Sequence, residues 1–223
     1  MELIPCGRQY LIDRERVMAY SDFSLAQAID QFSLNLYDRP RHFAPVPPIH
    51  PSDRLRELLQ ENVPLALASN TEKARSEWII APILVELRRQ LAGQISLFSG
   101  IDFDIDPSCG LNGRCDFLVA RSPELLLLKS PVTVLVEAKR ENINSGLGQC
   151  VAEMVAAWRF NQQANDPIPS IYGVVTTGTT WKFLGLRDHD SRLILEIDLD
   201  EYYLNQLDRI LGILTFCVTD KAP

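Results

Sequence analysis

Acidic and basic side chains meet at the end of a strongly apolar segment, residues 132–140, which reads VTVLVEAKR. Glu137 and Lys139 are two residues apart, so on an extended strand both side chains project from the same face. In the preceding predicted strand, RCDFLVA, Asp116 interrupts an apolar run directly after the glycine-bearing turn at 110–113. In an antiparallel meander these strands are neighbours, which would place Asp116 beside Glu137. The pattern predicts two carboxylates and one ammonium at one end of a sheet.

This combination favours a divalent cation. Two adjacent carboxylates repel each other and one has its pKa raised, unless a cation lies between them. Carboxylate and carbonyl oxygens with retained waters are the ligands that Mg²⁺ prefers. A lysine beside such a ligand can hold or activate an attacking water and stabilise developing negative charge. The alternative without catalytic function is an ordinary ion pair at a strand end.

Three further residues are candidates for the same site. Glu77 lies on the apolar stripe of its predicted helix, at spacings of three and four along Ile80 and Leu84, which predicts that it faces the sheet. A surface or capping glutamate explains Glu77 equally well, and Glu72 competes with it for an upstream acidic role. Gln149, near the start of another predicted helix, can reach the same end of the sheet, although glutamines at helix starts are mostly solvated.

Periodicity predicts the elements that position these residues. Residues 1–70 are expected to be a helical N-terminal extension, with Ser24 and Ser52 as N-caps and a proline-rich arm, RPRHFAPVPPIHP, between its helices. Residues 71–223 form the second predicted unit, which ends in an acidic tail. Its predicted elements are a long helix at 71–93, three strands within 95–140, a helix at about 145–164, two or three strands within 171–199 and a helix at 201–218. This order predicts an α/β fold, a sheet covered by helices.

Composition bounds the class of protein and its partners. The formal net charge is -7, and this value for the whole chain argues against nucleic-acid binding. The charge is, however, unevenly distributed along the sequence. Acidic and basic residues are equal in number over 71–187, and the acid excess lies mainly after residue 187. Within the neutral part, basic residues able to meet phosphates include Arg114, Arg121, Arg140 and Arg159. Binding to nucleic acid is therefore expected to be weak and salt-sensitive.

The cysteine pattern and the apolar segments bear on location. Five scattered cysteines without a C-x-x-C pair indicate neither a disulfide framework nor a zinc site, and they favour a reducing cytoplasm. The first 16 residues lack a basic head followed by an apolar run, and no apolar stretch approaches the length that spans a bilayer. The sequence predicts a cytoplasmic protein without a membrane partner.

The arrangement of Asp116, Glu137-Ala138-Lys139 and a downstream alanine-rich helix carrying Gln149 resembles the PD-(D/E)XK nuclease superfamily. The helix TEKARSEWIIAPIL followed by this motif is similar to the N-terminal nuclease segment of type I restriction enzyme motor subunits, and to uncharacterised cyanobacterial proteins of restriction-endonuclease-like fold. The resemblance covers about residues 71–187. Cys115 stands where the motif's name has proline, and Glu153 follows Gln149 where the RecB-like subgroup has tyrosine.

The resemblance implies a fold and a set of roles. The fold would be a restriction-endonuclease-like mixed sheet flanked by helices, and the activity Mg²⁺- or Mn²⁺-dependent hydrolysis of phosphodiester bonds. Asp116, Glu137 and Ala138 would bind the metal, Lys139 would stand at the nucleophile, and Glu77 would take the upstream acidic role, with Glu72 and Gln149 as accessory residues.

Three functions follow from these expectations. The first is a metal-dependent nuclease acting on nucleic acid, with DNA as the expected substrate. The second is a protein of the same fold that binds nucleic acid or a protein partner without cleavage, with the N-terminal extension as the interaction arm or as a homodimer contact. A structural protein with a vestigial site is the third, and the intact Asp116, Glu137 and Lys139 argue against it.

Overall fold

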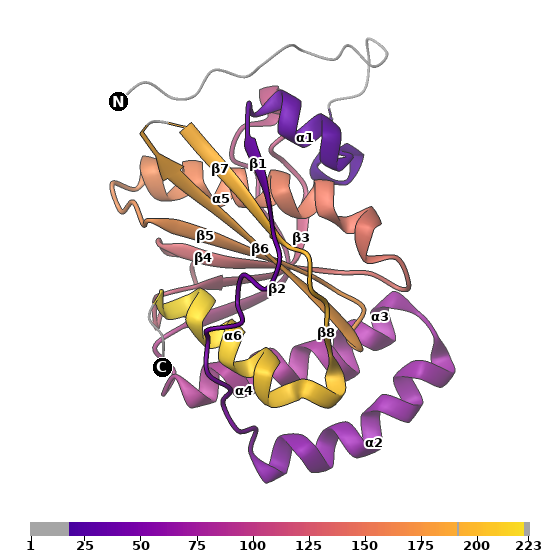
Figure 1. The fold of residues 1–223 in the computed structure, drawn as a ribbon. Helices are drawn as coiled ribbons and strands as arrows, with labels where there is room; N and C mark the ends of the chain where they lie inside the picture. The colour runs from indigo at the N-terminus through magenta and orange to yellow at the C-terminus, as the bar shows by residue number, and fades with distance from the viewer. Residues whose placement is uncertain (1–17, 191, 221–223) are drawn as a thin grey trace.

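The fold is that of a computed structural model, which describes residues 18–190 and 192–220. The first 16 residues, which carry the expectation that the chain has no export signal, lie outside these ranges. One mixed sheet runs through the described protein, with helices on both of its faces (Figure 1). Its spatial order is β1-β7-β6-β5-β4-β3-β2, and a short strand, β8, also pairs with β6. The predicted α/β class is therefore confirmed at this level.

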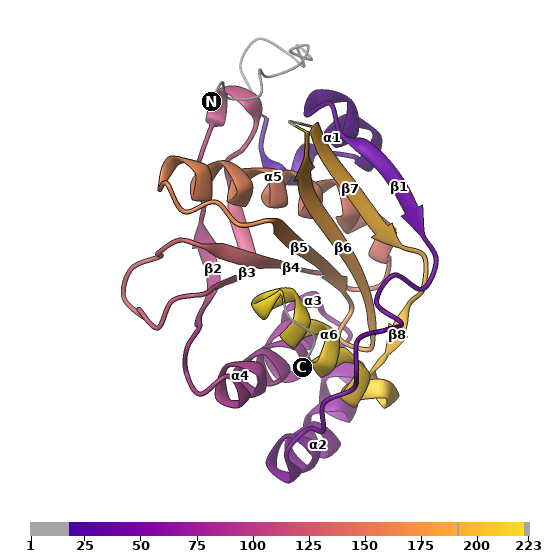
Figure 2. The ribbon, with the colours of Figure 1, turned by 60° about the vertical axis from the view of Figure 1, so that its left-hand side comes forward.

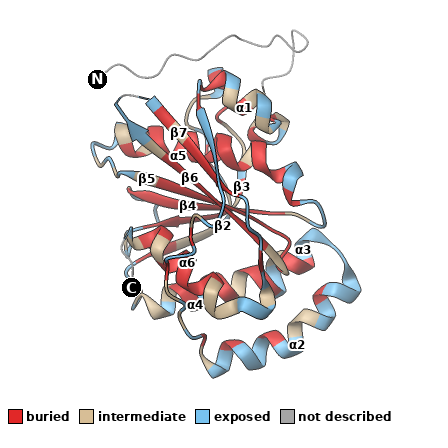
Figure 3. Ribbon diagram, in the orientation of Figure 1, coloured by how far each residue is buried: buried red, intermediate tan, exposed pale blue. Residues whose placement is uncertain are grey.

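Six of the eight described strands, β2 to β7, lie where periodicity predicts strands, whereas β1 was not predicted and β8 occupies the start of the segment 201–218 that was predicted to be a helix. In chain order the strands are β1 (Asn35–Arg39), β2 (Ser96–Asp102), β3 (Arg114–Ala120), β4 (Val132–Ala138), β5 (Ser170–Thr176), β6 (Thr180–His189), β7 (Arg192–Asp198) and β8 (Tyr202–Tyr203). The β2-β3-β4 segment is the predicted antiparallel meander, whereas β4 pairs with β5, and β1 with β7, in parallel. Every residue of β4 is buried, as its apolar composition on both faces predicts (Figure 3).

Helices form two layers. They are α1 (Leu25–Gln31), α2 (Asp53–Ser69), α3 (Glu72–Arg75), α4 (Ala81–Gln90), α5 (Leu147–Gln163) and α6 (Leu207–Thr219). On one face of the sheet lies α5, with α1 packed against it, and on the other face lie α4 and α6, with α2 outermost (Figure 2). A separate apolar cluster fills the space beneath each layer. The long α5 is the crossover that connects the parallel strands β4 and β5.

The described part of residues 1–70 is not purely helical, which corrects the expectation for this segment. Ser24 and Ser52 cap α1 and α2 as predicted, and the proline-rich arm is not helical. Between them, however, β1 adds a parallel strand to the edge of the sheet beside β7. The backbone of α1 also lies so close to α5 that a Cβ on Gly148 would stand 2.2 Å from the carbonyl oxygen of Phe23. Residues 18–70 thus pack into the same body as the rest of the chain.

The cysteines and the apolar segments can also be compared with what the sequence predicts. Cys109, Cys115, Cys150 and Cys217 are all buried free thiols. Within the described ranges, no helix combines the length and the apolar character that crossing a bilayer requires.

Candidate active site

Asp116 and Glu137 face each other across the β3–β4 pair. Phe117 pairs with Val136, so the antiparallel register places the preceding residue, Asp116, opposite Glu137 on the same face of the sheet. Asp116 Oδ2 accepts a 2.8 Å hydrogen bond from the backbone N–H of Ala138. The predicted convergence of these two acids at the end of the sheet is confirmed, while their chemical roles stay predictions.

Lys139 and Gln149 complete a hydrogen-bonded group around Glu137. The Lys139 ammonium lies 2.5 Å from Glu137 Oε1 and 3.3 Å from Gln149 Oε1. The Gln149 amide nitrogen donates to Glu137 Oε2 at 2.8 Å. Gln149 lies in the first turn of α5, whose placement on this face of the sheet brings the side chain over the end of β4. The structure therefore brings Gln149 into the site, as expected.

Burial makes the carboxylates of this site reluctant to ionise. Glu137 is only 2% exposed, and burial together with the charge of Asp116 raises its pKa to about 8 despite the opposing effect of Lys139. Burial also raises the pKa of Asp116, although the N–H of Ala138 and the charge of Lys139 oppose the rise. The metal-free site thus holds two carboxyl groups that disfavour a second negative charge.

Lys139 stays cationic in this setting. Burial lowers its pKa, but the carboxylates of Glu137, Glu72 and Asp116 outweigh burial and raise the pKa above its ordinary value. A charged ammonium has three N–H donors and no acceptor, and the contacts with Glu137 and Gln149 use two of them. The third is available to a water or a phosphate oxygen, since 19% of the side chain is exposed.

The expectation that Glu77 faces the sheet is wrong. Its side chain is 54% exposed and forms an ion pair with Lys73 at 3.3 Å. The predicted helix at 71–93 contains a π-helical turn, Ser76–Ile80, between α3 and α4. Buried positions consequently recur after five residues, from Ala74 to Ile79, instead of after three or four. The apolar stripe inferred from regular α-helical spacing therefore does not extend back to Glu77.

Pro82 accounts for the position of this π-helical turn. Proline has no N–H to donate to the carbonyl four residues earlier, which belongs to Trp78. The Asn62 side chain from α2 donates to that Trp78 oxygen at 3.1 Å. The N–H of Ala81 bonds to Ser76, five residues back. Pro82 thus interrupts the α-helical repeat and leaves a π-helical turn beside the candidate site.

A polar hollow of about 260 Å³ opens beside Asp116. Its lining includes the three acids Glu72, Glu77 and Asp116, together with Ser99, Gly100 and Ala138. Gly100 lies opposite Asp116 on β2 with a φ of +62°, a backbone conformation that glycine adopts without strain. A Cβ at Gly100 would lie 3.5 Å from Nε of Arg114, so the glycine leaves room for that guanidinium at the edge of the hollow.

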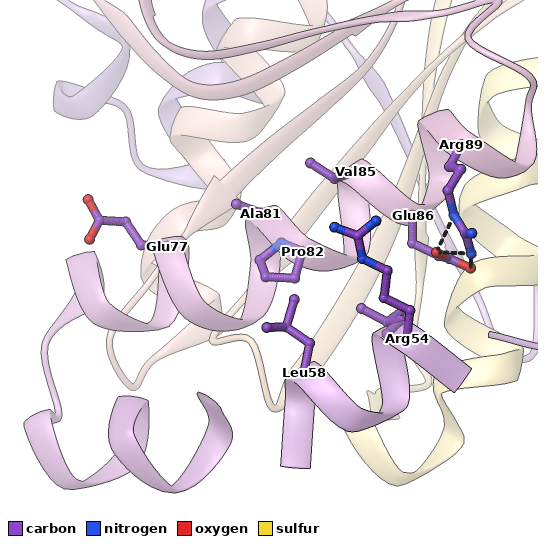
Figure 4. Close-up of a pocket in the computed structure, with 9 residues that line it drawn as sticks. Arg54, Leu58, Glu77, Ala81, Pro82, Val85, Glu86 and Arg89 are labelled. Atoms are coloured by element: carbon purple, nitrogen blue, oxygen red, sulfur yellow. Dashed lines mark hydrogen bonds and ion pairs between the residues drawn. The ribbon is translucent and has the colours of Figure 1, made fainter. Parts of the chain in front are cut away.

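Glu72 and Glu77 differ in their relation to Glu137. The charge of Glu72 contributes to the raised pKa of both Glu137 and Lys139, so Glu72 lies within electrostatic reach of the buried pair. Glu77 also lines a second hollow of about 330 Å³ between α2 and α4, which is walled by apolar residues such as Leu58 and Pro82 (Figure 4). The structure therefore favours Glu72 over Glu77 as the upstream acid.

The arginines that were expected to contact phosphates differ in how accessible their guanidinium groups are. Arg114 Nε donates to the Gly100 carbonyl at 2.6 Å, which holds this exposed guanidinium at the rim of the hollow. Arg140 is also exposed and pairs with Glu141. Arg159 was expected to be able to meet phosphates, but it is 4% exposed and pairs with Asp106 at 2.5 Å. Burial against this carboxylate removes Arg159 from the set of phosphate contacts.

Glu153 belongs to the site and was not selected from the sequence. Its Oε1 accepts from the Gln149 amide at 3.1 Å, and the residue is fully buried. Burial and the charge of Glu137 raise the pKa of Glu153 well above its ordinary value. The signal was present in the spacing of four residues between Gln149 and Glu153, which places both on one face of α5.

The donor set fits a hard divalent cation. Within residues 18–190 and 192–220, no group of three or more histidine, cysteine, aspartate or glutamate side chains converges on one metal position. Mg²⁺ is usually held by one or two carboxylates and keeps several waters, so Asp116, Glu137 and the backbone of Ala138 would offer the types of ligand that it takes. The raised pKa values of Asp116 and Glu137 are the electrostatic cost that a cation would remove.

Comparison with known proteins adds no relative to this description. No protein-family model matches the chain. Among curated proteins there is likewise no match.

The carboxylate pair makes metal-free stability depend on pH. Glu137 titrates near its ordinary value in the unfolded chain and at about 8 in the folded protein, so its stabilising contribution is complete below about pH 4.5 and is lost as the pH rises to 8. Asp116→Asn removes the negative charge beside Glu137 and keeps a side-chain oxygen that can accept the hydrogen bond from the backbone N–H of Ala138. We expect it to raise the unfolding midpoint at pH 8, relative to wild type, by about 2–4 °C, the shift that roughly 1 kcal/mol produces in a chain of this size.

The measurement is thermal unfolding in EDTA at pH 5 and pH 8. Glu57→Gln, on the exposed surface of α2, is the matched control for loss of one negative charge. An Asp116→Asn midpoint that differs from wild type equally at both pH values would contradict repulsion between the two acids.

Proposed function

We propose that the protein is a metal-dependent nuclease that hydrolyses phosphodiester bonds of DNA with Mg²⁺ or Mn²⁺. The observation that carries the proposal is the cross-strand pair of half-buried Asp116 and buried Glu137, with the Lys139 ammonium 2.5 Å from the Glu137 carboxylate. The antiparallel β2-β3-β4 meander, followed by α5 and the parallel strand β5, supports the finer proposal of a restriction-endonuclease-like fold.

Each residue has a role in this proposal. Asp116, Glu137 and the Ala138 backbone would hold the cation, which when bound stabilises negative charge on the phosphate and on the leaving oxygen. Lys139 holds the attacking water with its third N–H, and as a charged group it stabilises the developing negative charge rather than accepting a proton. One water is consumed: its oxygen bonds to phosphorus as the bond to the leaving sugar oxygen breaks, and of the two protons of the water one ends on that sugar oxygen and the other on the new terminal phosphate.

Substrate contacts would lie at the rim of the polar hollow. Arg114 is held there by Gly100, and the exposed Arg140 follows Lys139 directly in the chain. Across the sequence, 22 basic residues are outnumbered by 29 acidic ones, which gives a net charge of -7. Binding would therefore be weak and salt-sensitive, and a partner that brings the protein to DNA fits the proposal. The buried free cysteines agree with the reducing cytoplasm proposed as its location.

One observation favours the second candidate function, a protein of this fold that binds nucleic acid or a protein partner without cleavage. Both carboxylate oxygens of Glu137 already have protein partners, Lys139 at Oε1 and Gln149 at Oε2. An ion-paired network closed in this way can serve stability alone. Metal binding distinguishes the two functions, since a cation would have to share the Glu137 carboxylate with Lys139.

Removal of the ammonium or of the central carboxylate is expected to abolish cleavage. Lys139→Ala and Glu137→Ala should each lower the cleavage rate of plasmid or single-stranded DNA about 100-fold or more, as loss of a group that stabilises transition-state charge does. The assay follows purified protein with Mg²⁺ or Mn²⁺ and with EDTA. Lys129→Ala, on the exposed loop between β3 and β4, is the control for loss of one positive charge.

Two results would count against the proposal. Cleavage that persists in both Lys139→Ala and Glu137→Ala would assign the activity to another site or to a contaminating nuclease. Wild-type protein that binds DNA but neither takes up Mn²⁺ nor cleaves would support binding without catalysis.

Glu72 and Glu77 provide a matched pair of variants in one helical segment. Glu72→Gln should lower the cleavage rate by about 10-fold or more, because the charge of Glu72 acts on Glu137 and Lys139. This is the low end of the effect seen when a residue that supports a metal ligand is replaced. Glu77→Gln removes the exposed ion pair with Lys73 and one charge from the edge of the hollow, but the charge of Glu77 is not among the main charges that shift the pKa of Glu137 or Lys139, so the rate should change much less. Equal effects of the two variants, or a larger effect of Glu77→Gln, would reverse the assignment of the upstream acid.

A further inference from the structure

The amide of Gln149 has three charged or acidic neighbours that together fix its orientation. Its nitrogen donates to Glu137 Oε2 at 2.8 Å and to Glu153 Oε1 at 3.1 Å, and its oxygen lies 3.3 Å from the Lys139 ammonium. An ammonium can only donate, and a side-chain amide has two N–H donors on one nitrogen. A flipped amide would turn its oxygen towards both carboxyl groups and its nitrogen towards Lys139.

Glu153 is not explained by the packing of α5. It is 0% exposed, and the residues around it on this helix, such as Cys150, Val151 and Met154, are apolar and equally buried. Glu153 Oε2 is buried without a hydrogen-bond partner in the described protein. A buried polar atom left unpaired destabilises the fold, so an apolar residue would serve packing better.

The raised pKa of Glu153 is compatible with a role in holding the Gln149 amide. Burial, and after it the charge of Glu137, raise its pKa well above the ordinary value, which favours the protonated form. An uncharged carboxyl still accepts the Gln149 hydrogen bond through Oε1. It adds no negative charge to the two acids, Asp116 and Glu137, that already repel each other.

We propose that Glu153 is a positioning residue of this site: it fixes the Gln149 amide, which in turn holds Glu137 Oε2 and the Lys139 ammonium in the geometry that binds the cation and the phosphodiester. This inference rests on the proposed nuclease function. It assigns no contact with DNA to Glu153, whose side chain is fully buried.

Two variants separate hydrogen bonding from packing. Glu153→Met has a similar volume and no acceptor for Gln149, whereas Glu153→Gln is close in shape to the protonated acid and keeps an acceptor. We expect Glu153→Met to weaken Mn²⁺ binding and to lower kcat by about 10–100-fold each, the range found when a residue supporting a metal ligand is replaced. The KM for DNA should change little. Glu153→Gln should recover Mn²⁺ affinity and kcat to within about threefold of wild type, because its amide oxygen replaces Oε1.

The measurements are Mn²⁺ affinity, from the electron paramagnetic resonance signal of free Mn²⁺, and steady-state cleavage of DNA. Thermal unfolding checks that each variant is folded, and Gln163→Met at the exposed end of α5 is the control for the substitution itself. A double-mutant cycle with Gln149→Leu provides a second test. If Glu153 acts through Gln149, Glu153→Met should cost much less in the Gln149→Leu background than in wild type.

The outcomes separate this inference from the proposed function. A folded Glu153→Met protein that binds Mn²⁺ and cleaves like wild type overturns the inference and leaves the nuclease function standing. Equal losses in Glu153→Gln and Glu153→Met, or additive losses in the double-mutant cycle, also overturn it. Wild-type protein that neither binds Mn²⁺ nor cleaves DNA overturns both.

Discussion

The juxtaposition of Asp116 and Glu137 across two antiparallel strands is the constraint on which the candidate site depends. Placed side by side and largely out of water, the two carboxyl groups repel each other, and burial raises the pKa of both. Lys139, 2.5 Å from Glu137, offsets part of that repulsion. The position of α5 over the end of β4, and the close approach of α1 to α5, hold this arrangement in place.

Most of the sheet and the centre of the site could be predicted from local sequence patterns. The alternation of apolar residues in 132–140 indicates a buried strand, and the two-residue spacing of Glu137 and Lys139 fixes their common face. The connections between β2, β3 and β4 are turn-rich and contain no α-helix, which makes an antiparallel meander the simplest arrangement, and this places Asp116 opposite Glu137. Each of these inferences uses residues that are near in sequence or strands that are consecutive.

The features that could not be predicted depend on contacts between distant segments or on irregular backbone. A π-helical turn inserts one residue into the helical repeat, so regular spacing misplaces Glu77. The polar segment that forms β1 gains its place only by pairing with β7, more than 150 residues later in the chain. The four-residue spacing from Gln149 places Glu153 on the same face of α5, but its complete burial follows only from the docking of the whole of α5 on the sheet.

A crystal structure of the protein soaked in Mn²⁺, with anomalous difference density measured at the manganese edge, tests the central claim most directly. The account predicts one strong peak beside Asp116 and Glu137, within about 2.0–2.2 Å of carboxylate oxygens from both residues, the distance typical of small divalent cations with oxygen ligands. Absence of such a peak at a saturating concentration, with both Glu137 oxygens still bonded only to Lys139 and Gln149, would contradict it and leave an ion-paired network without a metal.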